Sequence, residues 1–212
     1  MSQVEKDGFL PTLHPTPDQL HAASQLTVLT ETGEPVQLGS LMRGDKGGKC
    51  IVIFIRHFYC GLCQDFISYL TSKITPAVLQ EHNLKLSIIG CGDWELIKPY
   101  RENLGTPFEI YSDPTKETYV ALGMTLRTLD MGSHQPEYQS SGIIGNIFSS
   151  IVKAFKIGSI FTKKAGDQKQ LGGEFVFANG QPVYTHRMEN TRGHAPLADL
   201  FAAAGLPAPT EQ

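Results

Sequence analysis

The residues with the clearest capacity for chemistry are two cysteines, Cys60 and Cys63, which form a C-x-x-C pair in the run RHFYCGLC. Ile51 to Ile55, just before that run, are all β-branched or aromatic, which predicts a strand buried on both faces. After the first cysteine, apolar residues recur at helical spacing from Leu62 to Leu70, which predicts an amphipathic helix. The pair therefore lies where a buried strand passes into a helix.

A cysteine at the start of a helix is suited to redox chemistry. The unpaired N–H groups and the positive end of the helix stabilise an anion, and the thiolate is the reactive form of cysteine. We therefore expect Cys60 to be the nucleophile. Cys63 follows one helical turn later on the same face, where it can reach back to form a disulfide. The order strand, C-x-x-C, helix is typical of a thioredoxin-like redox motif.

Two other interpretations of the C-x-x-C pair remain open. A zinc site usually needs a second pair of cysteines or histidines at short spacing, whereas Cys50 and Cys91 stand alone, so we expect no metal. The pair could also be two inert buried thiols, because free cysteine behaves as a small hydrophobe. That interpretation leaves the position at a helix start unexplained.

Three basic residues are candidates to assist the thiols. Arg56, four residues before Cys60, could hold a peroxide or lower the pKa of the thiol, and a surface ion pair is an equally weighted alternative. His57 and His194 are candidate proton carriers. For both histidines a plain surface position is the more ordinary expectation, because the sequence fixes no partner for either ring.

Composition narrows the possible functions. The 212 residues suffice for one α/β domain with a sizeable core. A formal net charge of −3 and a pI near 6.1 do not indicate a nucleic-acid-binding protein, because such proteins are generally basic. The N-terminus has neither a signal nor a transit pattern, and no run of apolar residues is long enough to span a membrane. We expect a cytoplasmic protein without a cofactor.

The first third of the chain predicts an arm and a hairpin. Residues 1–24 contain Pro11, Pro15 and Pro17 among polar residues, which predicts a flexible arm. Leu26 to Leu41 contains two short strand-like runs separated by turn residues, which predicts a hairpin.

The middle of the chain predicts further strand–helix units. Leu84 to Ile89 has the pattern of a strand, and Asp93 could cap a helix from Trp94 to Leu104. Trp94 itself is expected to pack or line a pocket. Cys91 would face the same edge as Cys60, as an alternative resolving thiol or, as we favour, a filler of the core. A third strand over Phe108 to Tyr111 and a helix from Asp113 to Leu122 complete the alternation.

The last third predicts an insert, a hairpin and a closing helix. Residues 124–171 are long for a connection, and apolar spacing predicts a helix over 144–155. That helix could be a lid or a lipid-contacting element, but we favour one packed on the domain or on a dimer partner. The Asn179-Gly180 turn predicts the clearest hairpin of the chain, and a helix over Ala195 to Ala204 precedes a tail at 207–212.

Several runs together resemble the peroxiredoxin-like 2 family, in the alkyl hydroperoxide reductase/thiol-specific antioxidant branch. They are RHFYCGLC, YSDPTKETYVALGM, LGGEFVF, NGQPVYTHR and GHAP, and the similarity covers roughly residues 25 to 205. The run LGMTLRTLDMG is most similar to the fungal members. The resemblance implies an α/β thioredoxin-like fold over one domain, 25–206, with a peroxiredoxin-type N-terminal hairpin and a helical insert at 124–171 before the final hairpin.

The resemblance also implies a function, namely a thiol oxidoreductase or antioxidant with Cys60 as nucleophile and Cys63 as its partner. The substrate would be a peroxide, a lipid (endo)peroxide or a disulfide, and the reductant of the thioredoxin or glutathione type. By analogy Arg187 would lie near the thiol, and a homodimer is possible. True peroxiredoxins have a Pro-x-x-x-Thr framework before the nucleophile, whereas this chain has Arg56 to Tyr59 there. The alternative is a non-catalytic thioredoxin-fold protein that binds a partner or senses redox state.

Overall fold

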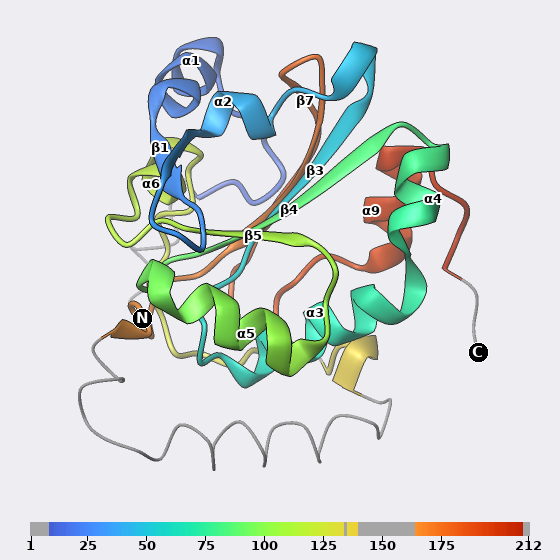
Figure 1. Ribbon diagram of the computed structural model, residues 1–212. Helices are drawn as coiled ribbons and strands as arrows, with labels where there is room; N and C mark the ends of the chain where they lie inside the picture. Colours follow the sequence, from blue (N-terminus) through green and yellow to red (C-terminus); the bar gives the residue numbers. More distant parts are fainter. Residues whose placement is uncertain (1–8, 134, 140–163, 210–212) are drawn as a thin grey trace.

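One mixed sheet organises the part of the chain that the computed structural model describes, residues 9–133, 135–139 and 164–209 (Figure 1). Its seven strands are arranged in the order β2-β1-β5-β4-β3-β6-β7. They are β1 (Thr27–Leu29), β2 (Pro35–Gln37), β3 (Lys49–Phe54), β4 (Leu84–Gly90), β5 (Glu109–Ser112), β6 (Gly173–Ala178) and β7 (Gln181–Arg187). The α/β fold class predicted from the sequence is confirmed.

Strands β3, β4 and β5 are parallel, and a hairpin closes each side of this parallel centre. The hairpin β1–β2 pairs antiparallel with β5, and the hairpin β6–β7 pairs antiparallel with β3. Both hairpins are those that the sequence predicts. Strand β3 is thus internal, between β4 and β6, and all three parallel strands end at the same edge of the sheet.

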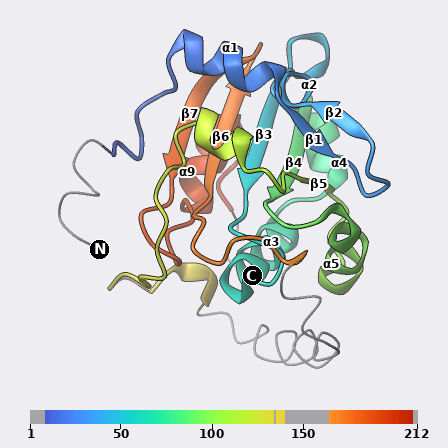
Figure 2. The ribbon, with the colours of Figure 1, turned by 90° about the vertical axis from the view of Figure 1, so that its left-hand side faces the viewer.

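Helices cover both faces of the sheet (Figure 2). One face carries α3 (Gly61–Lys73), α4 (Pro76–Glu81), α5 (Ile97–Leu104) and α9 (Leu197–Ala204). The other carries α1 (Pro17–Gln25), α2 (Leu38–Leu41) and α6 (Glu117–Ala121). Short 3₁₀ turns form η2 (Asp45–Gly47), η3 (Trp94–Leu96) and η4 (Glu137–Gln139).

Strand β3 is buried on both faces, as its sequence predicts. Ile51 and Ile53 belong to the core on the α3 side, and Val52 and Phe54 belong to the core on the α1 side. Successive side chains of a strand point to opposite faces, so an uninterrupted apolar run fills both cores. Each fully buried side chain of this kind contributes about 1.5–3 kcal/mol. The strand that leads to Cys60 is therefore firmly anchored.

From Pro17 on, the N-terminal segment is helical rather than the flexible arm predicted over residues 1–24. Pro17 opens helix α1, and Thr16 caps it in a reciprocal capping box with Gln19. Leu20 and Ala23 on this helix are buried in the α1-side core. The prolines indicated a loop, but proline at the first position of a helix has the right φ and loses no hydrogen bond. The missed signal was the T-P-x-Q pattern.

Two further predictions have mixed outcomes. The helix predicted from Trp94 begins as the turn η3, and the Asp93 side chain makes no capping hydrogen bond but pairs with Lys164 at 3.7 Å. Trp94 packs beside Gly33 at the edge of the α3-side core, which agrees with a packing role. The helix predicted over 144–155 lies outside the described residues. Within those residues, no helix has the length and apolar character that crossing a bilayer requires.

Candidate active site

The connection from β3 to α3 places Cys60 at the start of a 13-residue helix. Cys60 is the N-cap of α3, and its Sγ accepts a hydrogen bond from the backbone N–H of Cys63 at 3.4 Å. The N-cap position leaves the first N–H groups of the helix facing the sulfur. The structure therefore brings Cys60 and Cys63 together as the spacing predicts, with both cysteines as free thiols.

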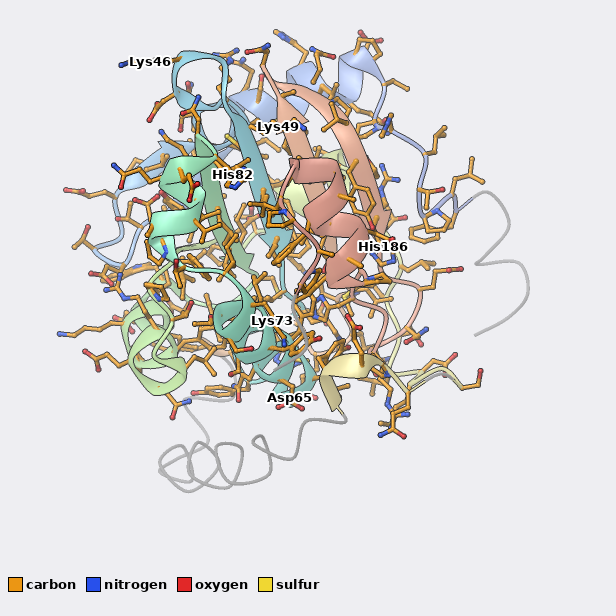
Figure 3. The ribbon with its side chains drawn as sticks, turned by 90° about the vertical axis from the view of Figure 1, so that its right-hand side faces the viewer. Lys46, Lys49, Asp65, Lys73, His82 and His186 are labelled. Atoms are coloured by element: carbon orange, nitrogen blue, oxygen red, sulfur yellow. The ribbon has the colours of Figure 1, made fainter. Side chains whose placement is uncertain are left out.

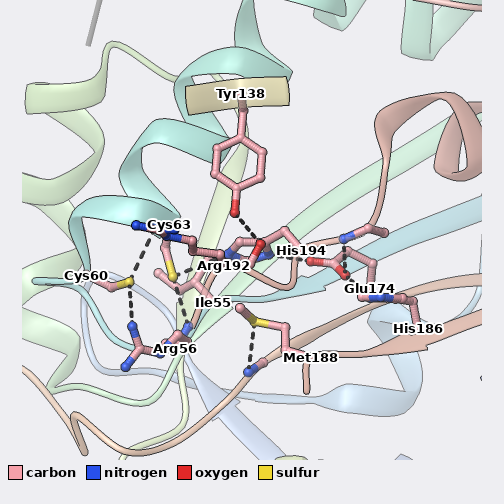
Figure 4. Close-up of polar contacts among 12 residues, drawn as sticks. Ile55, Arg56, Cys60, Cys63, Tyr138, Glu174, His186, Met188, Arg192 and His194 are labelled. Carbon is pink, nitrogen blue, oxygen red and sulfur yellow. Dashed lines mark hydrogen bonds and ion pairs between the residues drawn. The ribbon is translucent and has the colours of Figure 1, made fainter. Parts of the chain in front are cut away.

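Arg56 is the second group on the Cys60 sulfur (Figure 4). It lies just beyond β3, and its Nη1 donates to Cys60 Sγ at 3.2 Å. Its Nη2 donates to the carbonyl of Gln168 at 2.6 Å, and the residue is 5% exposed. Arg56 is therefore buried against the thiol, and the surface ion pair that we weighed for it does not form.

The two cysteines have different pKa values. The hydrogen bond from the Cys63 side chain lowers the pKa of Cys60 to about 6, against the opposing effect of burial and with help from Arg56. Burial and the adjacent Cys60 charge raise the pKa of Cys63 well above its ordinary value. Burial, and then the Cys60 charge, also raises the pKa of Asp65, which lies on α3 (Figure 3), to about 6. At neutral pH the pair is therefore a thiolate followed by a thiol.

Residues 164–171, at the end of the predicted insert, form one wall of the site. Besides the bond from Arg56 to Gln168, the carbonyl of Ala165 accepts from the Phe58 N–H at 3.3 Å. The ring of Phe58 packs on Gly90, where an added Cβ would lie 2.7 Å from the ring. The loop that carries Cys60 is thus held between the end of β4 and this segment.

Cys91 follows β4 and is also buried beside the site. Its Sγ donates to the backbone carbonyl of Arg56 at 2.9 Å, and burial raises the pKa of its thiol to about 12. A protonated thiol bonded to a carbonyl is suited to fixing the backbone. This geometry favours the core-filler interpretation over a resolving role.

Both candidate histidines are buried, so the expectation of plain surface positions is wrong. Burial and the neighbouring charge of Arg56 lower the pKa of His57 to about 4. Its Nδ1 has no hydrogen-bond partner among the described residues. His194 instead reaches the thiol pair, because its Nε2 lies 3.4 Å from Cys63 Sγ.

Glu174 is a functional candidate that the sequence reasoning missed. It lies inside β6 with no exposed surface, and its carboxylate contacts the rings of both His186 and His194. Burial alone would raise the pKa of Glu174, but the two histidines lower it to about 2. The available signal was an acidic residue within the apolar strand GEFVFA, because a buried acid needs partners.

Arg187 does not contact the thiols, contrary to the analogy drawn from the resemblance. It ends β7, two strands away from β3, and its Nε donates to the carbonyl of Leu122 at 2.7 Å. Its Nη1 donates to the carbonyls of Leu10 and Leu13 at 3.0 and 2.7 Å. Arg187 therefore fastens the N-terminal segment and the end of α6. In the described part of the chain, no group of three or more histidine, cysteine or acidic side chains could hold a metal ion.

The sheet, its flanking helices and the cysteine at the β3–α3 junction define a thioredoxin-fold protein of the peroxiredoxin type. The AhpC/TSA antioxidant enzyme family matches residues 70–190, and peroxiredoxin-like 2C of Bos taurus is 32% identical over 87% of this chain and 79% of its own. The chain belongs to this family, in its peroxiredoxin-like 2 branch. The fungal type stays a prediction. Family membership supports a thiol peroxidase-like redox function.

Solved structures agree on the fold. Peroxiredoxin Q of Xanthomonas campestris superposes with a TM-score of 0.57 at 13% identity, over 87% of this chain and 92% of that chain. Peroxidoxin BcpB of Mycobacterium tuberculosis gives a TM-score of 0.54 at 11% identity, over 92% and 94%. The thioredoxin-like fold is thereby confirmed. The family match begins after Cys63, so the C-x-x-C chemistry rests on the geometry of this chain.

Proposed function

We propose that the protein is a thiol oxidoreductase that reduces a peroxide through the Cys60–Cys63 pair. The observation that carries this proposal is the set of donors on one sulfur. The Arg56 guanidinium and the Cys63 N–H both point at Cys60 Sγ, which holds it as a thiolate at the start of a helix. Neither inert thiols nor half of a metal site would require a buried arginine on that sulfur.

The reaction follows from the two different thiols. The Cys60 thiolate attacks one peroxide oxygen, the O–O bond breaks, and the other oxygen leaves as alcohol or water after taking a proton. Cys60 is then a sulfenic acid. The Cys63 sulfur attacks it, water leaves, and an intramolecular disulfide remains. A reductant of the thioredoxin or glutathione type returns both thiols by supplying two electrons and two protons.

The site favours a small reacting group on the substrate. Cys60 is 3% exposed, so a hydroperoxide reaches its sulfur with less rearrangement than a protein disulfide does. The Nε of Arg56 has no hydrogen-bond partner among the described residues, which leaves a buried donor for a substrate oxygen. A lipid (endo)peroxide stays among the candidates, because it presents the same O–O group. The cytoplasmic location and the homodimer stay predictions.

A substrate screen on the wild-type protein tests the proposed function. Hydrogen peroxide, an organic hydroperoxide and a small disulfide are each supplied with thioredoxin or glutathione, and consumption of the oxidant is followed. We expect turnover of a hydroperoxide with formation of a Cys60–Cys63 disulfide, identified by peptide mass. If no substrate is consumed and neither thiol is oxidised, the thiol oxidoreductase proposal fails and a binding role is favoured.

Arg56→Gln is expected to raise the pKa of Cys60. A positive charge within hydrogen-bond distance favours the thiolate, and its loss shifts a pKa by about 1 unit or more. In the wild type, alkylation of Cys60 should rise with pH around a midpoint near 6, because the pKa of Cys60 is about 6. The midpoint of the variant should lie higher, and peroxide reduction at pH 6–7 should fall in proportion to the lost thiolate.

The matched control for this experiment is Arg187→Gln, which removes another arginine of equal 5% exposure that bonds only to carbonyls among the described residues. It should weaken the fold without moving the alkylation midpoint of Cys60. An unchanged midpoint in Arg56→Gln would show that the guanidinium has no part in activating the thiol.

A further inference from the structure

A chain of polar contacts leads away from Cys63 on the side of the sheet that holds β6 and β7 (Figure 4). His194 Nε2 lies 3.4 Å from Cys63 Sγ, and His194 Nδ1 lies 2.5 Å from Glu174 Oε1. The second carboxylate oxygen, Glu174 Oε2, lies 2.9 Å from His186 Nδ1. The thiol, imidazole and carboxylate thus form a continuous series, and the reaction described above assigns no role to the last two groups.

The His194 ring is held in one orientation. It stacks on Phe66 of α3 with ring centroids 4.2 Å apart and planes 2° apart, and it forms an edge-type pair with the ring of Tyr138. An ionised carboxylate only accepts hydrogen bonds, so Nδ1 carries the hydrogen that faces Glu174. In the neutral ring the free lone pair is then on Nε2, which faces Cys63. This is the tautomer that can take a proton from the thiol.

The Glu174 carboxylate can stabilise a positive charge on the His194 ring. Its side chain has no exposed surface, and Oε2 also accepts the backbone N–H of Ala195 at 3.1 Å. With its pKa near 2, the carboxylate stays charged throughout the neutral range. A buried negative charge beside imidazole stabilises the imidazolium that proton transfer creates.

The outer end of this series of polar contacts, at His186, reaches solvent. A cavity of about 340 Å³ is lined by both histidines together with Tyr138 and Arg192. The side chain of His186 is 22% exposed, and it lies on β7 beside helix α9, drawn in red (Figure 3). A proton that arrives at His194 therefore has a route to water that avoids the Cys60 side of the site.

We propose that His194 accepts the proton of Cys63 as this thiol closes the disulfide with Cys60, and that Glu174 is the positioning residue for the ring. The inference deepens the proposed function and rests on it. In this step the Cys63 S–H bond breaks and its proton moves to His194 Nε2. The S–S bond forms as the S–O bond of the Cys60 sulfenic acid breaks, and the departing hydroxide takes a proton from solvent to leave as water. The His194 imidazolium then returns the Cys63 proton to solvent, so no net proton is gained or lost.

The charge on Cys60 determines when the Cys63 proton can move to His194. While Cys60 is a thiolate, its negative charge and the hydrogen bond that it accepts from Cys63 keep the Cys63 proton in place. Oxidation to the sulfenic acid removes that charge. The His194 lone pair then becomes the strongest acceptor beside the thiol, so Cys63 is activated after the substrate has reacted.

The test compares two single-turnover rates in the wild type and in His194→Asn. The asparagine amide can still donate to Glu174, but it has no group that takes a proton from Cys63. Sulfenic acid formation, trapped with a dione probe, should stay within about twofold of the wild type. Disulfide closure should slow about 100-fold, the size typical of general base catalysis. It should also rise tenfold per pH unit, because hydroxide must then ionise Cys63.

Controls separate this role from a structural one. His14→Asn alters a histidine that bonds to Thr185 away from the thiols, and both rates should stay unchanged. Glu174→Gln keeps the shape of the positioning residue and should slow closure about tenfold; it decides the question if His194→Asn does not fold. If His194→Asn closes the disulfide at the wild-type rate and with the wild-type pH profile, the role of His194 is overturned, but the proposed function is not. A wild-type protein that forms no Cys60–Cys63 disulfide would instead overturn the proposed function.

Discussion

Replacing Cys60 with serine is expected to abolish turnover, whereas replacing Cys63 with serine is expected to stop the reaction after its first step. A serine hydroxyl stays protonated where the cysteine is a thiolate, so Cys60→Ser has no nucleophile for the peroxide. In Cys63→Ser the thiolate at position 60 still reacts, but no second sulfur is present to resolve the product. The sulfenic acid, or a mixed disulfide with an added thiol, should accumulate.

Intact-protein mass spectrometry after one equivalent of peroxide distinguishes the two outcomes. Cys63→Ser should gain one oxygen or one bound thiol at position 60, and Cys60→Ser should gain neither. Cys50→Ser is the matched control, because Cys50 is a buried thiol in the opposite core whose pKa is raised to about 11 by burial. It should turn over like the wild type. Full activity in Cys60→Ser would contradict the whole assignment.

Replacing Cys63 with serine should also change the pKa of Cys60. The Cys63 side chain is the first cause of the lowered pKa of Cys60, so its replacement should also raise that pKa. A serine hydroxyl can donate a hydrogen bond to the thiolate, so part of the effect should be kept. The first step in Cys63→Ser should therefore be slower at pH 6 than in the wild type and approach it at higher pH.

The part of the site that could be predicted is the part that is local in sequence. Strand β3, the C-x-x-C pair and α3 follow one another within 25 residues, Lys49 to Lys73, and the pattern of apolar residues determines their order. The contact of Arg56 with Cys60 spans four residues, and only its direction was open. Hydrophobic periodicity and helix-start chemistry act over the same short range.

The rest of the site depends on contacts that no local pattern encodes. His194 lies 131 positions from Cys63, and it is held there by Glu174 on β6, a strand that pairs antiparallel with β3. The pairing puts Glu174 opposite Ile53, next to the end of the strand that leads to the thiols. Strand register cannot be derived from the alternation of apolar residues in a strand that is buried on both faces.

The environment of Cys60 offers a physical basis for the thiol activation that we propose in a chain without the Pro-x-x-x-Thr framework. Arg56 supplies the positive charge, and its own backbone is fixed by the Cys91 thiol and the Cys63 sulfur. Arg56, one of the residues that stand at this position of the chain, is buried and donates to Cys60 Sγ.

Glu174→Ala is expected to be the most destabilising substitution in the described site. It leaves the rings of His194 and His186 and the Ala195 N–H without their shared acceptor. Removing one partner from a buried charged network typically costs about 3–5 kcal/mol. Urea unfolding at pH 7 should show a loss of this size, whereas the exposed Glu81→Ala should stay within about 0.5 kcal/mol of the wild type.

The pH dependence of that stability has a definite sign. Glu174 has a pKa of about 2 in the folded protein against 4.5 as its ordinary value, so its ionisation stabilises the fold above the unfolded pKa. This contribution should be lost as pH falls from about 5 toward 2, and it amounts to about 3 kcal/mol. The raised pKa of His186 acts oppositely, because its contribution is complete below its unfolded pKa and is lost as pH rises through its folded pKa.

Unfolding measured from pH 7 down to pH 2 separates Glu174 from the other acids. The wild type should lose stability steeply between pH 5 and 2, and Glu174→Ala should lose less over the same interval, because the group that binds the extra proton on unfolding is gone. An identical slope in both proteins would mean that Glu174 is not held as an anion by its two histidines. That result would also remove the charge that we infer to support His194 as the proton acceptor of Cys63.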